Sequence, residues 1–122
     1  MRVAPAITWY EVRVTDLELA TKFYSTVFDV TASPWEQYAL MSDADGRPVF
    51  ALEPVEASPP TDAYVRPTWD VEDLEAAVQL VRSAGGTVEL EREVISEEFG
   101  WWALARDPFG NYLAFSTSNP AR

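Results

Sequence analysis

Two short stretches of the sequence place charged and aromatic side chains at every second position. They are Trp9, Glu11 and Arg13 in the first stretch, and Arg66, Thr68 and Asp70 in the second. A period of two is typical of a half-buried β-strand, so each set shares one face of its strand. A carboxylate beside a guanidinium on such a face could act as a general base next to an oxyanion-stabilising group. The catalytic candidates are therefore Glu11, Asp70 and Arg66.

The same charges could instead neutralise one another. Because buried charges are rarely left alone, Glu11 with Arg66, or Arg13 with Asp70, is expected to form an ion pair. A carboxylate that is paired with an arginine stays ionised and is a weak base. Pairing therefore favours a binding role for these positions over a catalytic one.

Two residue types that carry much of enzyme chemistry are absent. The chain has no Cys, which excludes disulfides, thiolate nucleophiles and Cys-ligated zinc. It has no His, which removes the usual general base at neutral pH, the usual transition-metal ligand and every Ser-His-Asp arrangement. Any bound metal would have to be a hard cation held by carboxylates and carbonyls. We expect no cofactor.

Chain length and net charge limit the classes of protein and of binding partner that remain. The 122 residues suit one domain, and 48% of them are hydrophobic, which argues against disorder. The net charge of −11 repels phosphate backbones, so nucleic acid is an unsuitable partner. The same charge either simply keeps the protein in solution, which is the favoured interpretation, or attracts a cationic ligand. The N-terminal residues MRVAPAITWY lack the apolar run of a signal peptide, and no stretch could span a bilayer. The expected location is cytoplasmic, with no membrane partner.

An internal repeat indicates which elements carry the alternating residues. VTDLE at Val14–Glu18 matches VEDLE at Val71–Glu75, and each copy leads from an extended segment into a helix. Two copies of one supersecondary unit indicate a pseudo-symmetric domain. We therefore predict one domain over residues 1–122, with unit one at 6–54, a Pro-containing linker at 55–63 and unit two at 64–117.

In unit one the pattern predicts the order β-α-β-β-β. Thr15 is the expected N-cap of the helix, with Glu18 completing a capping box. Asp43–Gly46 (DADG) is a turn signal. The predicted strands are Thr8–Val14, Val30–Trp35, Gln37–Met41 and Pro48–Glu53, with the helix between the first two.

Unit two repeats this order. Its helix should end at Gly85 and Gly86, and Asp107–Asn111 (DPFGN) is typical of a type I turn. Residues 94–100 are expected to form a polar loop. The predicted strands are Tyr64–Val71, Thr87–Glu93, Trp101–Arg106 and Tyr112–Thr117.

These features resemble the vicinal oxygen chelate superfamily, which includes glyoxalase I, extradiol dioxygenases, and fosfomycin and bleomycin resistance proteins. The most specific segments are the two V-x-D-L helix starts, FYSTVFDV at Phe23–Val30 and WWALARDPFGNYLAF at Trp101–Phe115. The resemblance covers nearly the whole chain. It implies an α+β fold in which two pseudo-symmetric units form a curved, open barrel around a pocket, with the helices outside.

Metal-dependent members of the superfamily carry His or Gln on the first strand of each unit and Glu on the last strand. Carried over residue by residue, the first-strand positions hold Trp9 and Arg66, and the last-strand position of unit two holds Ala114. Aligning Gly46 with Gly110 gives Phe50 as the last-strand position of unit one. None of these four side chains can bind a divalent metal at neutral pH, so no metal site is expected.

Side-chain alternation and the resemblance together predict the residues that line the pocket. One of Trp101 and Trp102 should join them, although parity does not decide which. Trp9 and Phe50 could instead plug the space of the missing metal, and Tyr24, Phe28 and Trp69 are expected in the core. The predicted ligand-binding residues are Trp9, Glu11, Arg13, Phe50, Leu52, Arg66, Thr68, Asp70, Trp101 or Trp102, Tyr112 and Ala114.

Four functions remain open. The favoured one is a metal-independent protein that binds a small organic molecule, such as an antibiotic or another aromatic or cationic natural product, as drug-sequestering members do. The alternative is a cofactor-independent isomerase, cyclase or lyase that uses Glu11 or Asp70 as its base. The third is a protein-binding role with a filled pocket, and metal-dependent glyoxalase or dioxygenase activity ranks last. The resemblance also implies a homodimer.

Overall fold

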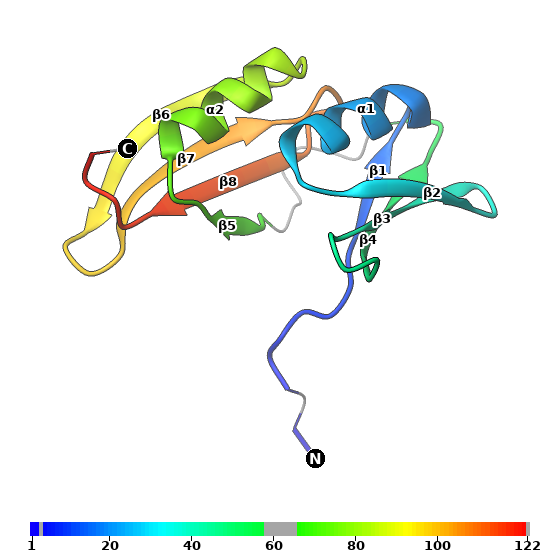
Figure 1. The fold of residues 1–122 in the computed structure, drawn as a ribbon, viewed down its shortest axis with the longest axis horizontal. Helices are drawn as coiled ribbons and strands as arrows, with labels where there is room; N and C mark the ends of the chain where they lie inside the picture. Colours follow the sequence, from blue (N-terminus) through cyan, green and yellow to red (C-terminus); the bar gives the residue numbers. More distant parts are fainter. Residues whose placement is uncertain (3, 58–65, 122) are drawn as a thin grey trace.

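The computed structural model describes residues 1–2, 4–57 and 66–121, which form two units placed side by side (Figure 1). The predicted β-α-β-β-β order is found in both. Residues 58–65, which include most of the predicted linker and the first residues of unit two, lie outside the described residues. Unit one contains β1 (Glu11–Val14), α1 (Leu17–Val27), β2 (Thr31–Trp35), β3 (Tyr38–Ser42) and β4 (Pro48–Pro54). Unit two contains β5 (Thr68–Asp70), α2 (Leu74–Ser83), β6 (Thr87–Ser96), β7 (Gly100–Arg106) and β8 (Tyr112–Thr117).

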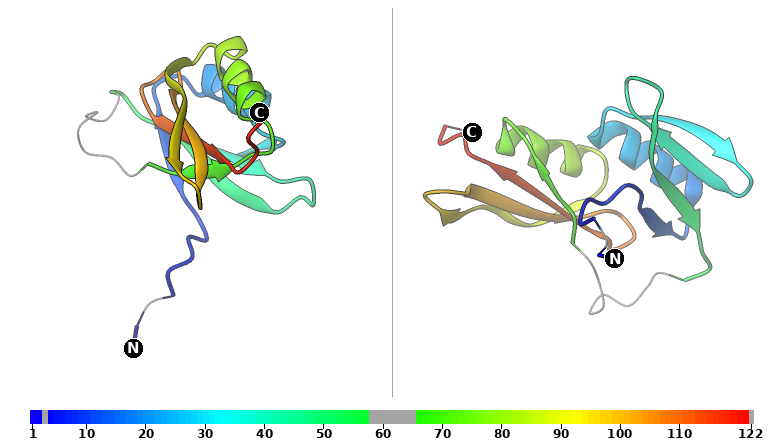
Figure 2. Two further views of the ribbon diagram at one scale, coloured as in Figure 1. Left: turned by 90° about the vertical axis from the view of Figure 1, so that its left-hand side faces the viewer. Right: turned by 90° about the horizontal axis from the view of Figure 1, so that it is seen from below.

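Each unit builds one four-stranded mixed sheet. The strand orders are β1-β4-β3-β2 and β5-β8-β7-β6, and the first strand of each unit is parallel to the last. The fold is α+β, and the sheets are curved and open without closing into a barrel. Both helices lie on the same side of the sheets, as the three views in Figures 1 and 2 show. Neither described helix has the length and apolar character needed to cross a membrane.

Both helices begin at an aspartate, which corrects the predicted cap at Thr15. Asp16 precedes α1 in extended conformation, and its Oδ1 accepts a hydrogen bond from the Leu19 amide at 3.1 Å. Asp73 does the same for α2 with the Ala76 amide at 3.0 Å. Asp is as good an N-cap as Thr, and the repeat places it at the same position in both copies. The predicted stop of α2 is confirmed, since the helix ends at Ser83 and Gly85 has a φ of 95°.

The predicted loop at residues 94–100 is shorter in the structure. β6 continues to Ser96 and β7 already begins at Gly100, and these two residues pair with each other. Gly100 has a φ of 77°, and a Cβ at this position would lie 2.1 Å from the Thr117 carbonyl oxygen. Polar side chains on an edge strand do not prevent ladder hydrogen bonds, so polarity alone was a misleading loop signal here.

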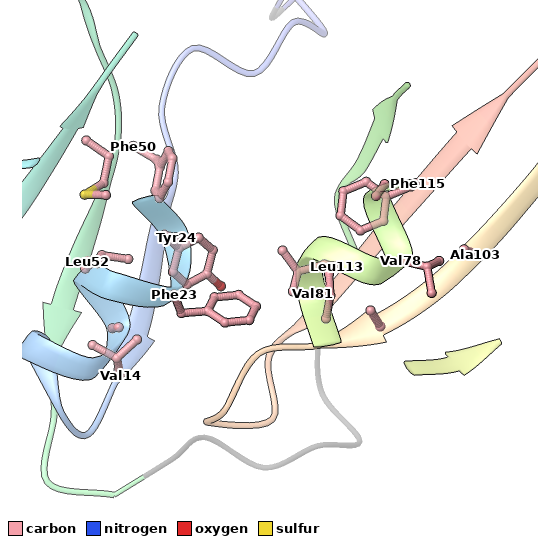
Figure 3. Packing of buried hydrophobic residues seen from close by; sticks show 14 of the residues in the cluster. Val14, Phe23, Tyr24, Phe50, Leu52, Val78, Val81, Ala103, Leu113 and Phe115 are labelled. Atoms are coloured by element: carbon pink, nitrogen blue, oxygen red, sulfur yellow. The ribbon is translucent and has the colours of Figure 1, made fainter. Parts of the chain in front are cut away.

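The core lies between the sheets and the helices and is continuous across the two units. Phe50 stacks on Tyr10 with ring centroids 5.0 Å apart, and Phe28 packs on Trp69 at 4.8 Å. Phe23 on α1 points toward the Leu113 side of unit two in Figure 3. Tyr24 is buried, and Phe28 and Trp69 are packed against the same cluster, so their predicted core placement is confirmed.

A polar contact also joins the units. The Tyr24 hydroxyl donates to Asp107 Oδ2 at 2.8 Å, and Asn111 Nδ2 donates to the same oxygen at 2.8 Å and to the Arg13 carbonyl at 2.9 Å. Asp107 is only 3% exposed. Burial, reinforced by the Asp107 carboxylate, raises the pKa of Tyr24 well above its usual value. The turn of unit two is therefore fixed directly to the helix and first strand of unit one.

Candidate ligand-binding face

The strand registers define which residues lie on the side of the sheets opposite the helices, called here the open face. In unit one Glu11 pairs with Ala51 and Arg13 pairs with Glu53. In unit two, Thr68 pairs with Ala114 and Asp70 with Ser116. Directly paired residues share a face, and their sequence neighbours Val14, Leu52 and Phe115 belong to the helix-side core. The predicted placement of Glu11, Arg13, Thr68, Asp70 and Ala114 on one face follows from this register.

Phe50 and Leu52 do not belong to this face, so their predicted pocket placement is wrong. Phe50 is 2% exposed and packs against the Tyr10 and Tyr24 rings, and Leu52 is fully buried in the same core. The cause is a β-bulge, because Met41 pairs with Phe50 while Ser42 pairs with Pro48. The extra residue reverses the parity of every later side chain in the strand.

The bulge also moves the metal-ligand position of unit one by one residue. Ala51 pairs with Glu11 as Ala114 pairs with Thr68, so Ala51 is the equivalent of Ala114. The four positions are thus Trp9, Arg66, Ala51 and Ala114, and none offers a lone pair to a divalent cation. In the part of the chain that the structure describes, no group of three acidic side chains is arranged to hold a metal ion. The residues present do not fit a metal centre.

The two adjacent tryptophans of β7 point to opposite faces. Trp102 pairs with Ser116 and lies on the open face, where the Arg66 guanidinium carbon is 4.8 Å from its ring centroid. Trp101 pairs with Thr117 and packs against the core, with Arg92 at 4.6 Å. Trp102 is therefore the tryptophan that completes the predicted set.

The charged residues do not pair as the sequence suggested. Neither Glu11 with Arg66 nor Arg13 with Asp70 is an ion pair in the structure. Arg13 Nε lies instead 3.6 Å from Glu53 Oε1, its direct neighbour in the β1–β4 ladder. Glu11 and Asp70 are exposed, and within residues 1–2, 4–57 and 66–121 neither has a hydrogen-bond or ion-pair partner. Glu53 is next to Arg13 in the β1–β4 ladder, whereas Asp70 belongs to the other unit. Arg13 therefore pairs with the nearer carboxylate.

Trp9 does not plug the open face. It is 40% exposed and lines a cleft of about 340 Å³ where the segment before β1 passes β5. This volume is at the lower end of the range for small-molecule sites. The walls of the cleft include Trp9, Tyr10 and Val49 from unit one and Pro67, Thr68 and Trp69 from unit two.

Tyr112 is fixed by an arginine that the sequence interpretation missed. The Arg106 guanidinium carbon lies 3.9 Å from the Tyr112 ring centroid, and Arg106 Nη2 donates to the Tyr112 hydroxyl. Arg106 also contacts Glu89 Oε1 through Nε at 2.5 Å. Extending the alternation of β7 from Trp102 by four residues would have identified Arg106.

The comparisons with known proteins agree with this architecture. The sequence model of the "Glyoxalase/Bleomycin resistance protein/Dioxygenase superfamily" matches residues 6–115. The comparison with curated proteins gives no match.

Solved structures with this fold have low sequence identity to the chain. The fosfomycin resistance protein FosX from Listeria monocytogenes, an E126Q mutant in complex with Mn(II) and 1S,2S-dihydroxypropylphosphonic acid, has a TM-score of 0.76 at 11% identity, covering 96% of this chain and 92% of FosX. A family enzyme from Burkholderia phytofirmans PsJN has a TM-score of 0.72 at 15% identity, with 91% and 97% covered. TioX from Micromonospora sp. ML1 has a TM-score of 0.65 at 17% identity, with 93% and 98% covered.

Proposed function

Because the chain belongs to the Glyoxalase/Bleomycin resistance protein/Dioxygenase superfamily, we propose that it is a metal-independent member that binds a small organic molecule. The observation that carries the proposal is the set of residues at the four metal-ligand positions: an indole, a guanidinium and two methyl groups. The fold itself accommodates a metal, since FosX is a complex with Mn(II). Loss of the metal in this chain would therefore come from side chains alone.

The cleft at the unit junction supports an aromatic ligand. Trp9, Tyr10 and Trp69 supply large ring surfaces along its walls. Aromatic pairs contribute about 0.5–1.5 kcal/mol beyond the area they bury. The overall charge of −11 adds a long-range attraction for cationic compounds. An aromatic or cationic natural product, such as an antibiotic that the protein sequesters, is the ligand class that suits these features.

A thermal-shift screen of planar natural products tests the proposal. A compound at 100 times its Kd should stabilise the native state by about 2.7 kcal/mol. Trp9→Ala should abolish the shift, because it removes one wall of the cleft. Trp35→Ala is the matched control, since Trp35 is an exposed tryptophan on β2 that does not line this cleft. The proposal would be contradicted if no compound raised the Tm, or if a compound gave the same thermal shift with Trp9→Ala as with the wild type.

A catalytic role has less support. Glu11 and Asp70 are exposed to water on the open face, so neither is held in the apolar surroundings that make a carboxylate a good general base. A ligand from the screen allows a direct test of an isomerase, cyclase or lyase. If Glu11→Gln abolishes turnover of that ligand without weakening its binding, the protein is an enzyme.

We also propose that the protein forms a homodimer. Val94, Ile95 and Phe99 expose apolar surface around the β6–β7 turn, and β2 and β6 are sheet edges. Sedimentation velocity should give twice the chain mass of 13.7 kDa. A monomer at micromolar concentration would contradict this proposal and leave the binding proposal unaffected.

A further inference from the structure

Two arginine–tryptophan stacks lie on opposite faces of β7. Arg92 stacks on Trp101 on the helix side, and Arg66 stacks on Trp102 on the open face, at 4.6 and 4.8 Å from the ring centroids. Both distances suit a cation–π contact. The two stacks therefore give an internal comparison of what each guanidinium does with its N–H groups.

The Arg92 guanidinium is used by the protein itself. Its Nη2 donates to the carbonyl oxygens of Asn119 at 3.1 Å and Pro120 at 3.3 Å, which fastens the C-terminal segment. Arg66 is exposed, and the described residues provide no hydrogen-bond acceptor or carboxylate for it. One guanidinium holds the C-terminal segment, and the other donates to no acceptor among the described residues.

A stacked guanidinium keeps its donors available. The contact with the Trp102 ring is not a hydrogen bond, so it leaves the five N–H bonds of the guanidinium available to acceptors. These donors match the two oxygens of a carboxylate or a similar acid group in a bidentate arrangement. The indole also restricts the side chain, so less conformational freedom is lost when an anion binds.

We propose that Arg66, positioned by Trp102, binds an acidic group of the ligand and makes the protein selective for aromatic acids. This rests on the proposed function, because the aromatic body of such a ligand would occupy the cleft, whose unit-two wall begins at the residue after Arg66. The next two residues, Pro67 and Thr68, form part of the cleft wall, and the Thr68 side chain is exposed. Ala114, paired with Thr68, is 0% exposed and adds only a methyl group to the open face there.

The acidic surroundings do not cancel this local charge. Asp70, on the same face of the strand, lies in one cross-strand row with Ser116 and Trp102, two strand spacings or about 10 Å from the Trp102 backbone. The Debye length is about 10 Å at 0.1 M salt, so a hydrated carboxylate at this separation is partly screened, whereas a bound anion is in direct contact with the guanidinium. The same screening reduces the effect of the overall negative charge.

Three probes that share one ring system test the inference. They are 2-naphthoate, 2-naphthamide and 2-naphthylmethylammonium, and isothermal titration calorimetry gives their Kd values. The wild-type protein should bind 2-naphthoate about tenfold more tightly than the amide, as a charge-assisted bidentate contact adds about 1.4 kcal/mol over a neutral one. Arg66→Gln should reduce this ratio to about one, and Arg66→Lys should retain part of it. Arg92→Gln, the matched control, should leave the ratio unchanged.

The outcomes separate this inference from the binding proposal. Equal binding of acid and amide by the wild type, tighter binding of the ammonium, or a preference that survives Arg66→Gln would overturn the role of Arg66 while leaving the binding proposal intact. Absence of binding by all three probes, together with an empty natural-product screen, would overturn both. Arg66 is exposed, so its variants should fold, and an unchanged Tm would confirm this.

Discussion

The two faces of the sheets differ in what their side chains do. On the helix side, aromatic rings from both units contact one another, and the inter-unit contact through Tyr24 and Asp107 is fully hydrogen-bonded. On the open face, Glu11 and Asp70 are exposed without partners among the described residues, and Arg66 contacts the Trp102 ring but no hydrogen-bond acceptor among them. One face is therefore closely packed, and the other presents charged side chains that the described residues leave without partners.

The largest expected effect tests this division with two aromatic residues. Phe50→Ala should lower the free energy of unfolding by about 3–5 kcal/mol, because it leaves a cavity in the core. Trp9→Ala, at a 40% exposed position, should lower it by less than about 1 kcal/mol. Urea denaturation of both variants provides the measurement. Similar losses for the two would show that the faces do not differ in this way.

The second-largest effect is expected at the hydrogen bond between the two units. Tyr24→Phe removes the hydroxyl that donates to Asp107, and the buried carboxylate then loses one of its donors. We expect a loss of about 1–3 kcal/mol in the free energy of unfolding. The effect should disappear in the background of Asp107→Ala, which can be measured as a double-mutant cycle. Additive losses would mean that the hydrogen bond does not couple the two units.

Alkaline pH should weaken the helix side selectively. Burial raises the pKa of Tyr10 to about 12 and that of Tyr24 well above its usual value. In the unfolded chain both ionise near pH 10, so the native state holds more protons above that pH and stability falls as pH rises. The Tm should be insensitive to these two groups below about pH 10 and should drop between about pH 10 and 12. In Tyr24→Phe this drop should be smaller, and an unchanged drop would contradict the assignment.

The smallest effect distinguishes two neighbouring residues at the start of α1. Asp16→Ala should lower the free energy of unfolding by about 1 kcal/mol, because it removes the helix cap. Thr15→Ala should be close to neutral. Thermal unfolding of the two variants would decide the matter, and the reverse order would restore Thr15 as the cap.

Much of the fold could be predicted because local patterns repeat in this chain. The VTDLE and VEDLE copies, together with the two turn signals, gave the β-α-β-β-β order of each unit. Side-chain parity also placed Glu11 and Thr68 on a shared face, because β1 and β5 contain no bulge. These features depend on residues that are close in sequence.

The errors in the candidate site have non-local causes. The bulge before Phe50 is visible only once β3 and β4 are paired, and it exchanged Phe50 for Ala51. The partner of Arg13 is set by the parallel pairing of β1 with β4, which no local pattern encodes. The pairing of β7 with β8 likewise determines that Trp102, and not Trp101, lies on the open face.

The most direct test of the central claim is a calorimetric titration of the strongest ligand from the screen, carried out once in EDTA and once with added Mn²⁺. An open face that binds organic molecules through its own side chains predicts the same Kd under both conditions. Binding that requires the added metal would contradict the account.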